Sequence, residues 1–178
     1  MKPLLASRRT VIGLNPEHSV IRTPLVTALV VIAGTVPVAA QSDAVKQEVL
    51  KPVVQLFDAM RKRDSAAVKT VFAPQARMVG VQERDGQVNL RYINPDEFAR
   101  AVGSAQTPPW DERIYDPEVR VDGRIATVWV KYDFLAGDKW SHCGIDAFQL
   151  ARLADGWKIT QLADTRQTTG CTTPAAPK

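Results

Sequence analysis

The chain has 178 residues, of which 45% are hydrophobic and 24% charged, proportions typical of one globular domain rather than of a disordered or fibrous protein. Most of its net charge of +4 comes from residues 1–40, because residues 41–178 carry 19 basic and 18 acidic side chains. A domain so nearly neutral lacks the basic face that nucleic-acid binding needs, and no recurring period indicates repeats or a coiled coil.

Residues 1–40 have the pattern of a secretory signal peptide. Basic residues precede twenty uncharged residues between Arg22 and Asp43, and the small residues Val38-Ala39-Ala40 resemble a signal-peptidase site. We therefore expect cleavage near Ala40 and a periplasmic or secreted protein without a membrane segment after cleavage. A retained membrane anchor is the alternative, because about twenty apolar residues can span a bilayer. The pair Arg8-Arg9 leaves a twin-arginine export route open beside the general one.

The two cysteines, Cys143 and Cys171, both follow the expected cleavage site. An oxidising compartment would allow them to form a disulfide, which closes a loop of about 29 residues and adds roughly 3–4 kcal/mol of stability. Two free thiols are the alternative. Two cysteines and one histidine do not make a zinc site, and no phosphate-binding glycine loop follows a predicted strand, so we expect neither a metal nor a cofactor.

Residues 41–171 are expected to form one domain, and residues 172–178 a loose tail. The predicted elements are helices over 44–63, 65–72 and 95–102 and strands over 77–83, 87–93, 113–121, 124–135, 139–153 and 157–166. Apolar residues at spacings of three and four indicate the first helix, with Ser42 or Asp43 as its cap. This order predicts an α+β domain, with three helices on a curved, mostly antiparallel sheet of about six strands.

Three stretches near the C-terminus carry a resemblance to a known family: His142-Cys143-Gly144-Ile145-Asp146, Gly156-Trp157-Lys158-Ile159 and Asp164-Thr165-Arg166. They resemble the closing hairpin of nuclear transport factor 2-like domains, and more narrowly of exported bacterial members labelled SnoaL-like or lumazine-binding. The resemblance implies a cystatin-like cone, in which a strongly bent sheet wraps around a helix and leaves a pocket at its open end. It also implies isomerases, cyclases and dehydratases, or binding and assembly proteins, as the classes of function.

Turn chemistry predicts the register of the closing strands. Three-residue loops at 136–138 and 154–156 would pair Phe134 with Trp140, Tyr132 with His142, Leu153 with Trp157, Leu150 with Thr160 and Asp146 with Asp164. One sheet face would then carry the expected ligand-binding side chains: Tyr132, Phe134, Trp140, His142, Asp146, Asp164 and Arg166. Phe148 would share this face, as a ligand contact or as part of the core. A slip of one residue in either hairpin would move half of the set to the other face.

His142, Asp146 and Asp164 are the candidate catalytic residues. The two aspartates, placed opposite each other, would share a proton unless Arg166 binds them, and an acid with a raised pKa beside His142 suits general acid–base catalysis. A structural polar network is the alternative. Ser141 is expected to face away from His142, which leaves no nucleophile–base pair.

Three functions follow from these patterns. The first is an exported domain that binds a small, partly apolar molecule in its cone. The second is a cofactor-independent isomerase, cyclase or dehydratase that uses a carboxylate–histidine pair. The third is a structural dimerisation module, because Trp129 is predicted on the outer face of the sheet, and members of the resembled superfamily often pair through that face.

Overall fold

The computed structural model describes residues 38–171, and side chains from residue 43 onward. Helices α1 (Val38–Lys62) and α2 (Ser65–Thr70) precede strands β1 (Phe72–Arg84) and β2 (Gln87–Ile93), helix α3 (Pro95–Gly103), and strands β3 (Trp110–Asp122), β4 (Ile125–Ala136), β5 (Lys139–Leu153) and β6 (Gly156–Arg166). The expected signal peptide, except for its last three residues, and the expected tail at 172–178 lie outside the described residues.

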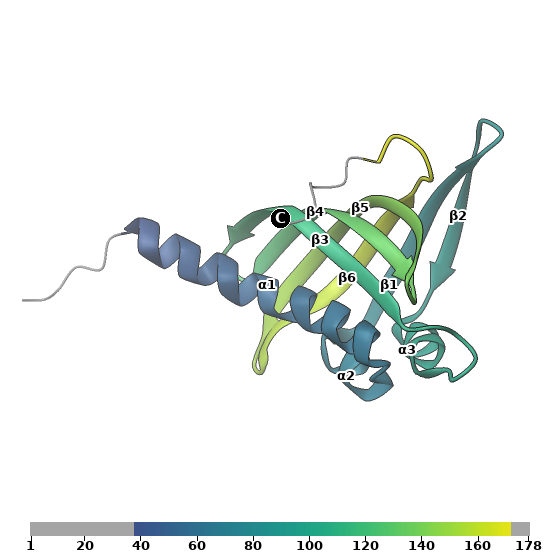
Figure 1. Cartoon of the computed structure of the whole chain (residues 1–178). Coiled ribbons are helices and arrows are strands. Elements are labelled where there is room, and N and C mark those ends of the chain that lie inside the picture. Colours follow the sequence, from purple (N-terminus) through teal and green to yellow (C-terminus); the bar gives the residue numbers. More distant parts are fainter. Residues whose placement is uncertain (1–37, 172–178) are drawn as a thin grey trace, which may run out of the picture. The chain divides into compact units, whose positions relative to one another are not determined.

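The six strands form one sheet in the order β2-β1-β6-β5-β4-β3. Neighbouring strands are antiparallel except β1 and β6, which run parallel. The sheet curves around α1, which packs against β3 and β6, while α2 and α3 contact β1 (Figure 1). The predicted α+β fold, with helices on a curved and mostly antiparallel sheet, is confirmed.

The predicted apolar face of α1 forms one half of the hydrophobic core. Val49, Val53 and Leu56 are fully buried, and the ring of Phe57 meets that of Phe148 edge-on, with the centroids 6.1 Å apart. Phe148 itself is only 1% exposed, which places it in the core rather than at a solvent-connected surface. Burying such side chains stabilises the fold by about 1.5–3 kcal/mol each.

Helix α2 ends at Thr70 rather than at the predicted residue 72, because β1 begins at Phe72, and α1 differs from prediction at its start. This helix begins at Val38, before the predicted caps Ser42 and Asp43, because no proline or glycine interrupts residues 38–43. The other starts are confirmed: Asp64 accepts a hydrogen bond from the Ala67 amide at 2.9 Å, and Asn94 forms a capping box. Within residues 38–171, no helix is both long enough and apolar enough to cross a membrane.

The register of β4 with β5 differs from prediction. The turn contains two residues, Gly137 and Asp138, so that Leu135 pairs with Trp140, and a β-bulge at Ser141 then shifts the ladder. His142 consequently pairs with Phe134, and Tyr132 with Gly144, so the predicted pairs Phe134–Trp140 and Tyr132–His142 are wrong.

The register of β5 with β6 is partly as predicted. The turn is again one residue shorter than expected, so Leu153 pairs with Gly156 rather than with Trp157, and Leu150 pairs with Ile159 rather than with Thr160. The register shifts by one residue at Thr160, which restores the predicted pairing of Asp146 with Asp164.

The predicted disulfide between Cys143 and Cys171 is confirmed, with Cα atoms 5.9 Å apart. It ties the end of the described chain to β5. Next to it, the backbones of Cys143 and Gln167 exchange two hydrogen bonds of 3.0 Å. The segment that follows β6 is therefore held against the end of the sheet that carries His142.

We expect Gly144→Ala to destabilise the protein by about 3 kcal/mol or more, because an added Cβ would overlap the Thr165 carbonyl oxygen and lie 2.9 Å from the Tyr132 ring. Gly80→Ala is the matched control, since its Cβ would meet the Asp164 carboxylate at 3.4 Å and the Arg91 carbonyl oxygen at 4.0 Å, without overlap. Urea unfolding of the two variants measures the difference. Equal midpoints would contradict the close approach of β5 to β6 at this position.

Candidate functional site

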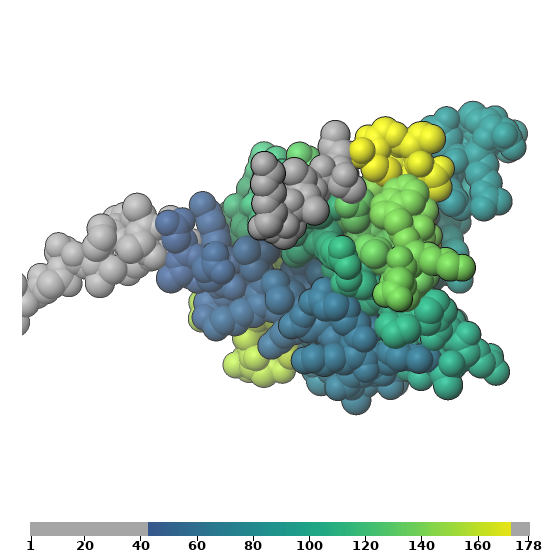
Figure 2. Space-filling view, in the orientation of Figure 1, coloured from purple at the N-terminus to yellow at the C-terminus, as the bar shows by residue number. Residues whose placement is uncertain are grey.

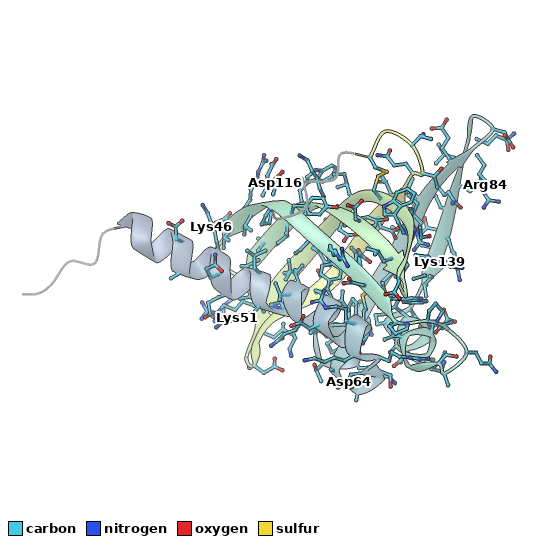
Figure 3. All side chains as sticks on the ribbon, in the orientation of Figure 1. Lys46, Lys51, Asp64, Arg84, Asp116 and Lys139 are labelled. Atoms are coloured by element: carbon cyan, nitrogen blue, oxygen red, sulfur yellow. A yellow bond between two sulfur atoms is a disulfide. The ribbon has the colours of Figure 1, made fainter. Side chains whose placement is uncertain are left out.

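A groove of about 1210 Å³ opens on the concave side of the sheet and narrows to an inner cavity of about 40 Å³. The β1–β2 hairpin, the start of β5 and residues 165–169 line its mouth (Figure 2). Arg84, which also lines the groove, lies near the tip of that hairpin (Figure 3). The groove and the inner cavity share six lining residues: Met60, Ile93, Phe98, Glu112, His142 and Arg166.

One wall of the groove is a continuous row of aromatic rings contributed by α3, β3, β4 and β5. The ring centroids of Phe98 and Trp110 lie 5.8 Å apart, and those of Trp110 and Phe134 lie 6.0 Å apart. Phe134 is stacked on His142 at 4.7 Å, and His142 meets Tyr132 edge-on at 5.7 Å. This row offers flat apolar surfaces to a ring system in the groove.

Three carboxyl groups meet at the floor of the groove. Asp146 on β5 is 1% exposed and pairs with Asp164 on β6, as predicted. Asp164 accepts a hydrogen bond from Arg166 Nε at 2.8 Å. The third carboxyl group belongs to Glu112 on β3, which is half-buried and hydrogen-bonds to Asp146.

The proton at this floor is held by a carboxyl pair that the sequence did not indicate. Burial raises the pKa of Asp146 well above its usual range, and the adjacent Glu112 raises it further. Burial also raises the pKa of Glu112 to about 7, although its hydrogen bond with Asp146 opposes that shift. Arg166 pairs with Asp164, so the pair that holds a proton is Asp146–Glu112 rather than Asp146–Asp164.

His142 and Tyr132 contribute uncharged groups to the site. Burial, with help from the nearby Arg166 cation, lowers the pKa of His142 to about 4, so its imidazole is neutral at pH 7. The Tyr132 hydroxyl donates to the Thr165 carbonyl oxygen at 2.8 Å, and burial raises its pKa. Contrary to prediction, Ser141 does not face away: its Oγ lies 3.0 Å from His142 Nδ1, because the bulge turns it.

Six of the seven predicted ligand-binding residues line the groove or its inner cavity: Tyr132, Phe134, His142, Asp146, Asp164 and Arg166. Trp140 lies apart from them. It pairs with Leu135 before the bulge, and its Nε1 donates at 3.3 Å to Asp133, on the other face of β4. The bulge at Ser141 therefore separates Trp140 from the face that carries His142.

The sequence interpretation missed Glu112, Trp110 and Phe98. The predicted strand over 113–121 begins too late, because β3 already begins at Trp110, and Glu112 follows Trp110 on the same strand face. The available signal was the alternation of Trp110, Glu112 and Ile114, in which an acid occupies a position that alternation assigns to the core face. Among the described residues, no group of three His, Cys, Asp or Glu side chains could hold a metal ion.

The raised pKa of Glu112 makes stability depend on pH. The pKa of Glu112 is 4.5 in the unfolded chain and about 7 in the folded protein. Its contribution to stability is therefore fully present below pH 4.5 and is lost as the pH rises through about 7. His142 acts in the opposite sense between pH 4 and 6.5, because its folded-state pKa is lowered. Only the difference between variant and wild type therefore isolates Glu112.

We expect Glu112→Gln to gain stability relative to wild type between pH 4.5 and 8, by about 1–2 kcal/mol after allowing for solvent screening of a half-buried group. Urea unfolding at a series of pH values measures this difference. Glu83→Gln is the control, because that exposed side chain also lines the groove. Parallel stability profiles for wild type and Glu112→Gln would refute the buried acid pair.

Comparison with known proteins identifies the family. The family described as "Putative lumazine-binding" matches residues 44–162. No curated protein matches the sequence. Solved structures share the fold at low identity. A Streptomyces avermitilis protein described as a putative dehydratase from the NTF2-like family has a TM-score of 0.55 and 18% identity, over 72% of this chain and 99% of that one.

Two further structures support the same fold. An NTF2-like superfamily protein of Salmonella enterica serovar Typhimurium has a TM-score of 0.56 and 15% identity, over 75% of this chain and 99% of that one. A Nostoc punctiforme protein of unknown function with a cystatin-like fold has a TM-score of 0.55 and 10% identity, over 70% of this chain and 92% of that one. The chain therefore belongs to the "Putative lumazine-binding" family, and it shares its fold with these NTF2-like structures.

Proposed function

We propose that the domain binds a small, partly apolar molecule in the groove of its cone. The observation that carries this proposal is the row of aromatic rings that leads down to a buried acid pair. An apolar wall with a few convergent polar groups is the usual composition of a small-molecule site. Lumazine, which the family name mentions, is a planar molecule with two fused rings and polar edges, and it suits this combination.

The charged and polar residues that line the groove favour a ligand whose solvent-facing end is polar. Arg84 and Arg91 line the groove together with the carboxylates of Glu83 and Glu97 and the neutral side chains of Gln82 and Gln167. Guanidinium groups bind carboxylates and phosphates through paired hydrogen bonds. The ligand that we propose is therefore flat and apolar along its middle and polar where it meets solvent.

We expect a panel of planar two-ring molecules that includes lumazine to contain binders that raise the melting temperature of the protein. Phe134→Ala should weaken such binding about five- to tenfold, because it removes a ring from the aromatic wall. Trp129→Ala, on the outer face, is the control and should bind as wild type does. The absence of any binder in the panel, or full binding by Phe134→Ala, would argue against this function.

A second candidate function is acid–base catalysis on the bound molecule, as in an isomerase, cyclase or dehydratase. The pKa of about 7 for Glu112, beside a protonated Asp146, is the observation that favours it. The acid–base pair would then be Glu112 and Asp146, because a pKa of about 4 makes the His142 imidazole a weak base. Nuclear magnetic resonance spectra of each binder, recorded before and after incubation, separate conversion from simple binding.

We propose that the domain is exported and acts in the periplasm or outside the cell. The disulfide between Cys143 and Cys171 supports this location, since such bonds persist in oxidising compartments.

We also propose that the domain forms a homodimer through the outer face of the sheet. Strand pairing places Trp129, Ala147, Ala163, Val79 and Tyr92 in one row across five strands. Trp129 is 53% exposed and Tyr92 70% exposed, and a shallow hollow of about 440 Å³ lies over the two alanines. In a two-fold dimer, Trp129 of each protomer would fill the hollow of the other.

We expect Trp129→Ala to weaken this dimer at least about tenfold. Truncating a buried interface tryptophan commonly costs about 2 kcal/mol or more of binding free energy. Sedimentation over a range of protein concentrations measures the dissociation constant. Leu153→Ala, which changes another exposed apolar side chain, should leave it unchanged. A wild-type chain that stays monomeric at millimolar concentration would exclude the dimer.

A further inference from the structure

The inner cavity beneath the aromatic wall is lined by the carboxyl groups of Glu112, Asp146 and Asp164. A ring stacked on the aromatic wall would leave these groups without a ligand partner. We propose that it receives a hydrogen-bond-donating nitrogen, an amino or amidine group carried on a planar ring, with Asp146 and Glu112 as the acceptors. This inference rests on the proposed function, and it names the chemistry of the end of the ligand that enters first.

Asp146 offers a buried acceptor without a donor. Its side chain is 1% exposed and lines the cavity, and no donor among residues 43–171 hydrogen-bonds to Oδ2. Burial and the adjacent Glu112 both raise the pKa of Asp146, so the proton of this pair stays on Asp146. Leaving an acceptor buried without a donor costs about 1–3 kcal/mol, which a ligand N–H would recover.

The charges around the cavity favour a donor or a cation over an anion. Arg166 is paired with Asp164, and its charge is therefore balanced. His142 is neutral, and the Tyr132 hydroxyl is already bound to the Thr165 carbonyl. What remains is the Asp146–Glu112 pair, which carries one proton and one negative charge when Glu112 is ionised. A carboxylate on the ligand would be repelled by this pair.

The size of the cavity limits what enters it. A volume of about 40 Å³ admits a single small polar group such as an amino nitrogen, or a water molecule, but not a ring. The ring that carries the nitrogen would stay in the groove above, against the stacked pair of Phe134 and His142. A positively charged amidine would also be attracted to the aromatic faces around it.

Two quinolines that differ in one substituent test the proposal with the full chain: quinolin-2-amine and quinoline-2-carboxylate. Titration calorimetry at pH 7 should show the amine binding at least about tenfold more tightly than the carboxylate. Glu112→Gln should reverse this order, because its amide NH₂ presents a donor where the carboxylate presented an acceptor.

Each outcome decides between the proposals. Tight binding of both quinolines, with no effect of Glu112→Gln, would leave binding in the cone intact and overturn the preference for a donor. Preference for the carboxylate would overturn it as well. If neither quinoline binds while lumazine or another member of the panel does, the nitrogen subsite is wrong and the proposed function stands. Trp129→Ala is the matched control and should bind both quinolines as wild type does.

Discussion

A carboxyl group as deeply buried as Asp146 cannot be ionised without a large loss of hydration energy, and this constraint organises the floor of the groove. The fold meets it by keeping a proton on Asp146 and placing Glu112 where it can accept that proton in a hydrogen bond. Arg166 cannot serve as the counter-charge, because Asp164 already holds it. The resulting pair is polar, shares one proton, and faces a cavity that ends an otherwise aromatic surface.

The strand that carries Asp146 shows how packing and site depend on each other. Even-numbered residues from His142 to Phe148 face the concave side, whereas the odd-numbered Cys143 faces away and is anchored by the disulfide. Gly144 is inward-facing but has no side chain, and the space this leaves is taken by the Tyr132 ring and the Thr165 backbone. The close approach of β6 to β5 therefore follows from a missing Cβ, and it brings Arg166 of β6 near His142 of β5.

The sequence was sufficient to predict the element order, the caps of α2 and α3, the disulfide and the face of α1 that is buried, because each depends on local spacing or on a single residue type. It was not sufficient to predict the bulges at Ser141 and Thr160. A bulge depends on how two strands pair along their whole length, and the residues of one strand do not show this. Between β5 and β6, the predicted turn was one residue too long and the bulge was not foreseen, and these two errors cancelled at Asp146–Asp164. Between β4 and β5 the errors did not cancel, and Trp140 was assigned to the wrong face. Glu112 was missed because β3 reaches the floor only through the order of strands in the sheet.

The same strands carry both of the surfaces to which we assign a role. Along β4, Tyr132 and Phe134 face the groove while Trp129 faces outward, and along β5 His142 and Asp146 face inward while Ala147 faces outward. Because alternate residues of a strand point to opposite faces, a ligand in the cone and a second protomer on the outer face would touch different side chains. A substitution at Trp129 therefore leaves the groove-facing side chains of β4 in place, and a substitution at Phe134 leaves the outer row in place. For this reason, ligand binding in the cone and pairing through the outer face can be tested independently of each other.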